Sequence, residues 1–369
     1  MAKYSSLYIH VPFCKTKCDY CAFYSYTNAS NKDHDLFFKK LISDLLANKK
    51  KCSTLQSIFI GGGTPTLLPD KYMKRLFEVI KENFLLSENI EVTIEANPET
   101  LTDNKISFLG SLPINRISIG IQSFSKDHRQ TIGRKSSVSN IKNKLTKLRK
   151  TGIKNINIDL IYGIPGQSID DWKRDLKKAS KLPIKHLSAY ELTLEESSKL
   201  SKNKDLTIPD EKDITKMWKI TNTFFYKGTK IKRYEISNYA KKGYECLHNC
   251  SFWEGATYLG LGPSAVSFDG KRRIKEPENF TEWLNNKKRQ IEFVSKDKRT
   301  KELFMLNLRT TKGIDMKKFY AKTGINVLEK FKTQLTEFKD HNLLKLTNSH
   351  LVPTRKGLLL SDHIAKEIL

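Results

Sequence analysis

Strand-like runs and longer helical patterns alternate through the first half of the chain. Six short β-rich segments stand out, at 7–11, 57–60, 90–95, 116–121, 155–161 and 186–192. Alternating strands and helices predict a parallel sheet, and six such units predict an α/β fold built as a partial (β/α) barrel of the TIM type. Functional side chains of such a barrel gather at the carboxyl ends of its strands.

The pattern changes near residue 290. A polar run at 293–300 leads into helical spacing, with amphipathic helices expected at 316–323 and 326–341, a short hairpin from 343–346 and 350–353, and a last helix. We therefore expect a barrel core at 1–235, a connecting segment at 236–299, and a small helix-rich, winged-helix-like domain at 300–369.

Three cysteines lie close together near the start of the chain. Cys14, Cys18 and Cys21 are spaced four and then three residues apart. A [4Fe-4S] cluster takes one thiolate per iron, so three cysteines hold the cluster and leave one iron open for a small ligand. Structural zinc is the alternative, and it would need His10 or a distant cysteine as a fourth ligand. Six cysteines in 369 residues are too sparse for a disulfide framework, which indicates a reducing compartment.

A glycine-rich turn follows the second predicted strand. Gly61, Gly62 and Gly63 precede Thr64 and Pro65. Missing side chains let the backbone approach a ligand closely, although a tight strand-to-helix turn uses glycine for the same reason. No Gly-Lys-Ser/Thr follows, which excludes a Walker A phosphate loop.

Composition and charge narrow the class of partners. The chain has 66 Lys and Arg against 40 Asp and Glu, a formal net charge of +26. The lysines are scattered over nearly every predicted helix, which is typical of a solvated surface and not of a nucleic-acid-binding arm. The N-terminus has no signal-peptide pattern and no apolar run approaches membrane-spanning length, so we expect a soluble cytoplasmic protein.

The cysteine triad, the glycine turn and the alternating strands together resemble the radical S-adenosylmethionine (radical SAM) superfamily. Segments 10–14, 94–98, 120–124 and 157–166 are similar to one of its branches, the oxygen-independent coproporphyrinogen III oxidase group, and the likeness extends into the C-terminal domain. The resemblance implies a [4Fe-4S] cluster on the three cysteines, with SAM as an exchangeable ligand of the open iron. In that family an electron from the cluster cleaves SAM to a deoxyadenosyl radical.

The resemblance also implies a set of SAM contacts. Glu95 would accept hydrogen bonds from the ribose hydroxyls, and Gly63 and Thr64 match positions associated with a second SAM in the oxidases. Tyr20 and Phe23 would shield the cluster from water. The residues expected to contact SAM are Tyr8, Tyr20, Gly62, Gly63, Thr64, Glu95, Gln122, Arg134 and Asp159.

The chain departs from the oxidases in two respects. They carry a fourth cysteine two residues beyond the triad, where this chain has Phe23, and a long segment ahead of the triad. In both respects the chain resembles the heme chaperones, which are relatives with the same barrel that bind heme and pass it to acceptor proteins. Their His-Asn-x-x-Tyr-Trp signature has a counterpart at 248–253, with Phe252 in place of the tyrosine.

In this resemblance His248 would be the ligand of the heme iron, and Trp253 together with Tyr258 would stack on the macrocycle. Cys246 and Cys250 flank the histidine, so thiolate ligation or a minor zinc site stays open.

Three functions follow, in order of preference. The first is a heme chaperone with a [4Fe-4S] cluster and SAM, the second a coproporphyrinogen III oxidase, and the third a tRNA-modifying radical SAM enzyme. Whether the chain is an enzyme is left open, with Phe23 arguing against porphyrinogen decarboxylation. Expected partners are heme and heme-acceptor proteins, without nucleic acid; membrane-associated acceptors and a homodimer are left open.

Overall fold

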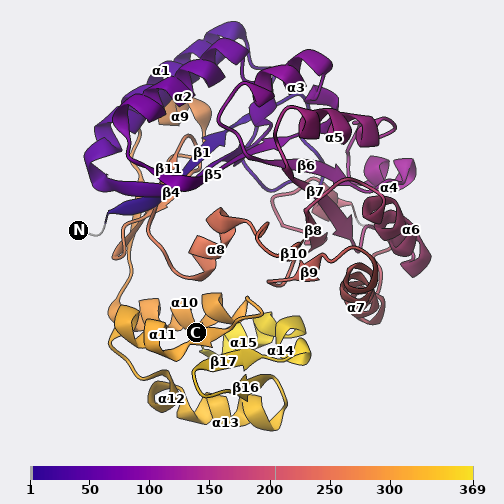
Figure 1. Ribbon diagram of the computed structural model, residues 1–369, viewed down its shortest axis with the longest axis vertical. Helices are drawn as coiled ribbons and strands as arrows, with labels where there is room; N and C mark the ends of the chain where they lie inside the picture. The colour runs from indigo at the N-terminus through magenta and orange to yellow at the C-terminus, as the bar shows by residue number, and fades with distance from the viewer. Residues whose placement is uncertain (1–2, 204, 369) are drawn as a thin grey trace.

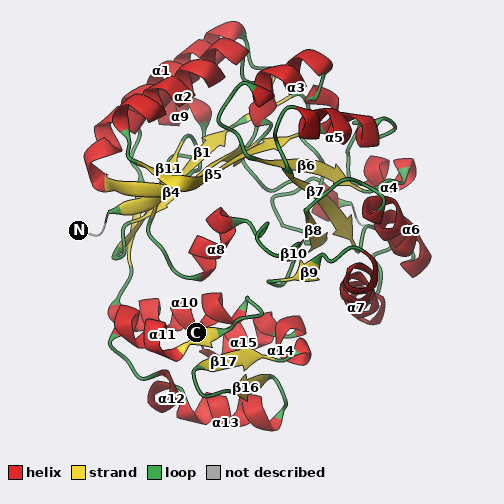
Figure 2. Cartoon of the chain, in the orientation of Figure 1, coloured by secondary structure: helices red, strands yellow, loops and turns green. Residues whose placement is uncertain are grey.

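The computed structural model describes residues 3–203 and 205–368, and its main feature is one strongly curved sheet (Figure 1). Helices line the convex face of this sheet, and a smaller helix-rich part lies across its open side. Strands and helices alternate through the N-terminal half of the ribbon, as Figure 2 shows. The predicted α/β class and partial barrel are confirmed.

Seven of the described strands run parallel at the centre of the sheet, in the order β11-β1-β4-β5-β6-β7-β8. Apolar side chains on one face of these strands, such as Ile58, Ile94 and Ile117, are buried beneath the helices. Polar side chains, such as those of Ser57 and Glu95, alternate with these apolar side chains along the strands. They face the concave interior, because successive strand residues point to opposite faces. The parallel strands are β1 (Tyr4–Val11), β4 (Cys52–Gly62), β5 (Leu86–Ala96), β6 (Arg116–Gln122), β7 (Asn155–Tyr162), β8 (His186–Glu191) and β11 (Tyr258–Leu261).

Several helices of the convex face begin at polar capping residues. Ser30 and Ser168 each form a capping box with the aspartate three residues on, which satisfies amide groups that the first helical turn leaves without partners. The helices outside the sheet are α1 (Asn31–Asn48), α2 (Asp70–Asn83), α3 (Asp103–Gly110), α4 (Lys126–Thr131), α5 (Ile141–Lys150), α6 (Ile169–Ser180), α7 (Glu211–Gly228) and α9 (Phe280–Leu284). Single 3-10 turns are η1 (Lys49–Lys51), η2 (Pro65–Leu67), η3 (Pro98–Thr100) and η4 (Leu200–Lys202).

Most of the strands near the edges of the sheet come from the segment that the sequence predicted only as a connection. Strand β11 pairs with β1, so a strand late in the chain lies beside the first one. Helix α8 (Leu247–Trp253), just before β11, is therefore brought inside the curve of the sheet (Figure 1). The shorter strands are β2 (Phe13–Cys14), β3 (Tyr26–Thr27), β9 (Lys232–Arg233), β10 (Asn238–Ala240), β12 (Val266–Phe268), β13 (Arg272–Lys275) and β14 (Gln290–Phe293).

The C-terminal part packs helices around a small antiparallel sheet and has its own apolar core. The single helix expected at 326–341 is wrong, because the chain breaks at Phe331, whose ring packs 4.4 Å from that of Phe304. The expected last helix is likewise divided, at Leu360. The elements are α10 (Lys296–Leu308), β15 (Ile314–Asp315), α11 (Met316–Thr323), α12 (Val327–Lys330), α13 (Lys332–Asp340), β16 (Leu344–Leu346), β17 (His350–Pro353), α14 (Arg355–Leu359) and α15 (Ser361–Ile368).

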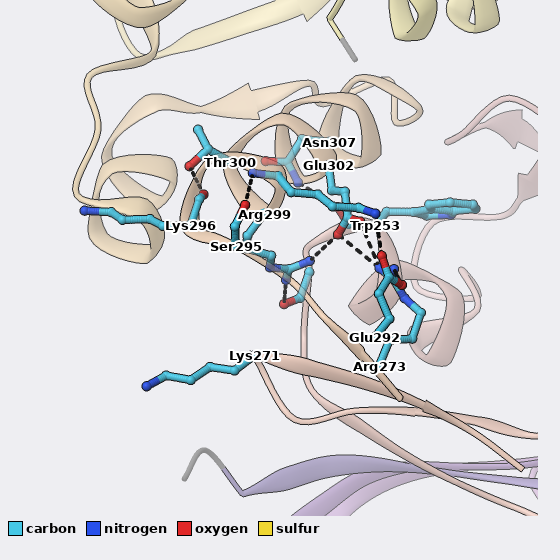
Figure 3. Close-up of polar contacts among 12 residues, drawn as sticks. Trp253, Lys271, Arg273, Glu292, Ser295, Lys296, Arg299, Thr300, Glu302 and Asn307 are labelled. Atoms are coloured by element: carbon cyan, nitrogen blue, oxygen red, sulfur yellow. Dashed lines mark hydrogen bonds and ion pairs between the residues drawn. The ribbon is translucent and has the colours of Figure 1, made fainter. Parts of the chain in front are cut away.

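A polar network fixes the first helix of this part to the edge of the large sheet (Figure 3). Arg273 of β13 forms ion pairs with Glu292 of β14 at 2.6 Å and with Glu302 of α10 at 3.0 Å. The Asn307 side chain donates a hydrogen bond to the backbone oxygen of Trp253 at 2.6 Å, which ties α10 to the end of α8. Within the described part of the chain, no helix is both long and apolar enough to cross a membrane.

Candidate functional site

The cysteine loop leaves the carboxyl end of β1 and is anchored on both sides. Strand β2 pairs with β3, so the two ends of the loop lie together. Backbone hydrogen bonds of Asp19 to Ile132 and Leu200 hold the middle of the loop against the far side of the barrel mouth. Cys14, Cys18 and Cys21 are free thiols and half-buried in this loop.

The loop cysteines are desolvated and have one cation nearby. Burial raises the pKa of the Cys14 thiol to about 11, although its contact with Thr64 lowers it, and burial also raises that of Cys21. Arg134 Nη1 lies 3.6 Å from Cys18 Sγ. Metal binding would therefore displace protons from at least two thiols. In residues 3–203 and 205–368, no three His, Cys, Asp or Glu side chains are grouped closely enough to hold a metal ion.

The glycine turn after β4 packs directly against the cysteine loop. Gly63 N donates to Val11 O at 2.8 Å and Thr64 N to Phe13 O at 2.7 Å, which sets Thr64 Oγ1 3.8 Å from Cys14 Sγ. Gly62 has φ +104°, and a Cβ there would lie 2.6 Å from the His10 ring. Only glycine fits this close approach.

Glu95, at the end of β5, faces the same turn. Its Oε2 accepts a hydrogen bond from Gly62 N at 3.0 Å, and a Cβ on Gly61 would lie 2.9 Å from that oxygen. Burial, and then the charge of Asp159, raise the pKa of Glu95 to about 8. The carboxyl therefore carries a proton at neutral pH until a ligand or cation compensates its charge.

Asn97 links these elements and was not among the predicted contacts. Its Nδ2 donates to Thr64 Oγ1 at 3.0 Å, and its Oδ1 accepts from Arg134 Nη2. Arg134 Nη2 also donates to Gly120 O at 2.6 Å. The sequence could have indicated this role, because Asn97 lies in segment 94–98, two residues after the predicted contact Glu95.

Gln122 and Asp159 complete the rim of the barrel. Gln122, at the end of β6, is buried with φ +68°, and a Cβ on Gly120 would lie 2.8 Å from its Nε2. Asp159 accepts a hydrogen bond from Ser118 Oγ at 3.2 Å and another from Asn157 Nδ2 at 2.7 Å.

The two predicted tyrosines lie in different surroundings. The Tyr8 hydroxyl forms a hydrogen bond with His10 Nδ1 at 3.0 Å. Tyr20 is half-buried and packs against a small apolar cluster made of Ile132, Ile161, Ile164 and Leu200.

The raised pKa of Glu95 predicts a pH-dependent stability that Glu95→Gln removes. Between about pH 4.5 and pH 8 the unfolded carboxyl is ionised while the folded one keeps its proton, so stability falls as pH rises through this window. We expect the parent chain to lose ~4 kcal/mol more than Glu95→Gln between pH 5 and pH 8.5. Urea unfolding at both pH values measures this, and parallel pH profiles would contradict it.

His248 lies on α8 inside the barrel. Its side chain is 3% exposed; Nδ1 bonds Ser57 Oγ at 2.8 Å, while Nε2 is buried without a hydrogen-bond partner. Its ring lies 5.1 Å from that of Phe59 and 6.4 Å from that of Tyr8. Burial, with a contribution from Arg116, lowers the pKa of His248 to about 3, so the imidazole is neutral and Nε2 can act as a lone-pair donor when Ser57 accepts from Nδ1.

A buried carboxylate from β5 holds the start of this helix, which the sequence did not reveal. Glu91 accepts hydrogen bonds from the backbone amides of Leu247 and His248, both at 3.0 Å, and from the Cys246 thiol at 3.5 Å. Arg116 Nε lies 4.0 Å from the same carboxylate. Burial raises the pKa of the Cys246 thiol, so this cysteine is a donor to Glu91 and not a ready thiolate.

Removing the Glu91 carboxylate is expected to destabilise the fold. Glu91→Ala leaves Arg116 as an unpaired buried charge and frees two helix amides, which should cost about 3 kcal/mol of unfolding free energy. Glu88→Ala removes an exposed carboxylate from the same strand and should change stability by less than about 0.5 kcal/mol. Denaturant unfolding of both variants measures the difference; equal stability of the two would contradict the capping role.

Three of the predicted residues do not take up the expected positions. Trp253 lies five residues after His248 on α8, so its ring faces another direction, with the Arg309 guanidinium 5.0 Å from its centre. Tyr258 packs on Phe252, with ring centres 4.2 Å apart, and not on Trp253.

Phe23 is 69% exposed, so it does not shield the cysteine loop as expected. Burial raises the pKa of the half-buried Cys250 thiol to about 12.

Comparison with known families agrees with this geometry. The model of the radical SAM superfamily matches residues 8–179, and that of the HemN C-terminal domain matches residues 294–360. An open barrel with a cysteine loop after its first strand, matched in this way, defines a radical SAM protein with a HemN-like C-terminal domain.

The relatives narrow this class. The heme chaperone HemW of Buchnera aphidicola subsp. Schizaphis graminum is 36% identical over 99% of this chain and 98% of its own length. HemW of Bacillus subtilis is 30% identical over 97% of both chains, and HemW of Escherichia coli is 33% identical over 87% of this chain and 86% of its own. The chain belongs to the HemW family.

One solved structure shares the whole fold. Coproporphyrinogen III oxidase (HemN) from Escherichia coli, a radical SAM enzyme, matches with a TM-score of 0.86 and 21% identity, over 99% of this chain and 90% of its own. At this identity the likeness is one of fold.

Proposed function

We propose that this protein is a heme chaperone, which binds heme through His248 and transfers it to an acceptor protein. The observation that carries the proposal is the buried, unpartnered Nε2 of His248, at the head of the segment that resembles the heme chaperone signature. A neutral imidazole with a free nitrogen is a common axial ligand of heme iron, and Ser57 holds the other nitrogen. Phe59 and Phe252 give the ring apolar neighbours.

The residues of the barrel mouth suit a cluster and SAM. Cys14, Cys18 and Cys21 are the donor set for a [4Fe-4S] cluster with one open iron, and Arg134 lies beside Cys18 to balance thiolate charge. When bound, these groups supply reductive cleavage of SAM's sulfonium bond. The chain's own part is to bind and orient SAM. Gly62 and Gly63 allow a close backbone approach, and Glu95 Oε1, which has no hydrogen-bond partner among the described residues, would accept a hydrogen bond from a ligand hydroxyl.

Expectations from the sequence that remain proposals are the cytoplasmic location, the possible acceptors and the domain limits at 235 and 299. The other proposed SAM contacts rest, like Glu95, on the resemblance. They are Gly63, Thr64, Gln122, Asp159, Tyr8 and Tyr20. Trp253 remains a proposed heme contact only if α8 shifts on binding, because its ring lies against Arg309.

A coproporphyrinogen oxidase is the second candidate, favoured by the shared fold with HemN. Against it stands Phe23, which occupies the place of the oxidases' fourth cysteine and points to solvent.

Anaerobic reconstitution followed by heme titration and transfer separates the two. A chaperone takes up heme in a saturable one-to-one complex and gives it to an apo-acceptor hemoprotein faster than free heme is taken up. Incubation with coproporphyrinogen III, SAM and reductant should yield no protoporphyrinogen. Formation of that product would reject the chaperone as the sole function, and heme uptake without saturation would reject it outright.

A further inference from the structure

The scattered lysines of the sequence are partly gathered by the fold. Helices α6 and α7 lie side by side on the outside of the barrel (Figure 1). Between them is a hollow of about 610 Å³, lined by Lys173, Arg174, Lys177, Lys216, Lys219, Ile220, Thr223 and Phe224. We call it the α6–α7 groove. Five of its eight lining residues are cationic, although they come from two segments some forty residues apart in the sequence.

Three of these cations have no acidic partner. Lys173 pairs with Asp170 at 2.8 Å and Arg174 pairs with Asp171, both within the first turns of α6. Lys177, Lys216 and Lys219 are exposed, and their ammonium groups form no ion pair within residues 3–203 and 205–368. The groove therefore presents uncompensated positive charge on both of its sides.

The floor of the groove is apolar. Ile220 and Phe224 are one helical turn apart on α7 and half-buried between the basic rims. Lys173 and Lys177 on α6 are four residues apart, and Lys216 and Lys219 on α7 are three apart, so each pair also lies on one side of its helix. An occupant that satisfies this surface needs an apolar ridge with negative charge on both flanks.

We infer that the α6–α7 groove binds an acidic amphipathic helix of a partner protein. A concave strip between two helices accommodates a third helix, with apolar side chains at one-turn spacing on Ile220 and Phe224 and carboxylates facing the rims. A flat bilayer surface suits this hollow less well, because Ile220 and Phe224 are half-buried while the cations around them are exposed. Single-stranded RNA favours grooves with exposed stacking aromatics, and Phe224 is the one aromatic lining residue.

The test uses a fluorescein-labelled peptide of about 14 residues, a helix roughly 20 Å long, with Leu along one helical face and Glu on both flanks. Its binding to the full chain is followed by fluorescence anisotropy. We expect saturable binding that weakens with salt and falls at least 10-fold in the triple variant Lys177→Glu, Lys216→Glu, Lys219→Glu. A peptide of the same composition with the helical pattern scrambled should bind at least 5-fold more weakly.

The control reverses the same number of charges at another basic patch. Arg149, Lys150 and Lys154 line a smaller hollow of about 250 Å³ without apolar residues. Their triple glutamate variant should keep peptide binding within 2-fold. All six residues are exposed, so circular dichroism and the unfolding midpoint should stay at the parent values.

Several outcomes would overturn the inference. Equal loss of binding in the two triple variants, or equal binding of the scrambled peptide, would mean that net charge and not the groove binds the probe. The inference would also be overturned if the peptide fails to bind while another ligand binds at the groove. Heme, phosphatidylglycerol vesicles and single-stranded RNA are the ligands to test, and their binding would have to weaken when Lys177, Lys216 and Lys219 are changed to Glu. Heme loading through His248 lies inside the barrel and is read separately, so its failure would leave this result unaffected.

Discussion

Alanine at any one of Cys14, Cys18 or Cys21 is expected to abolish cluster assembly. In the proposed cluster each thiolate would bind a different iron, so two remaining ligands would leave two irons exposed to solvent and reductant. After anaerobic reconstitution with iron and sulfide, bound iron should fall at least 10-fold in each variant. The change should leave the fold intact, since the three side chains lie in a loop outside the apolar core.

Cys52→Ala is the matched control. Its thiol is free and half-buried at the start of β4, far along the chain from the loop, and the variant should hold as much iron as the parent. If a single alanine in the loop leaves iron and sulfide content unchanged, the three cysteines are not the cluster ligands. Iron or zinc bound without sulfide would indicate a mononuclear site instead.

His248→Ala is expected to weaken heme binding at least 10-fold. The substitution removes the buried, unpartnered Nε2 and leaves Ser57, Phe59 and Tyr8 around a small cavity. Anaerobic heme titration, read by visible absorption, should give a lower affinity and a changed spectrum, because the axial ligand sets the electronic state of the iron. Cluster content should stay at the parent level, since the described contacts of the His248 ring are with Ser57, Phe59 and other barrel residues and not with the three cysteines.

Two variants separate ligation from packing. His363→Ala removes an exposed histidine of α15 and should leave the titration unchanged. Cys250→Ala tests the thiolate that the sequence left open. Loss of heme binding in Cys250→Ala with retention in His248→Ala would transfer the ligand role to the cysteine, and equal affinity of both with the parent would place heme elsewhere.

Much of the barrel could be predicted because its signals are local. Each parallel strand carries one apolar and one polar face, and each lies between segments with helical spacing, so the six predicted strands were found where expected. The cysteine loop and the glycine turn are also contiguous in sequence. Their mutual contact follows from parallel topology, which brings the carboxyl ends of neighbouring strands to one edge. The break at Phe331 was missed because buried packing on Phe304 overrides a continuous helical pattern.

By itself, the sequence determined the α/β class, the cysteine loop, the glycine turn and the candidate histidine, because these depend on residues a few positions apart. Tertiary structure decided what surrounds them. The pairing of β11 with β1 carries α8 into the barrel, where Glu91, more than 150 residues earlier, caps it and fixes the His248 ring. The same long-range packing turned Trp253 toward Arg309 and joined the lysines of α6 and α7 into one groove. Such contacts are set by which surfaces the whole fold buries together, and no local pattern of the chain records that choice.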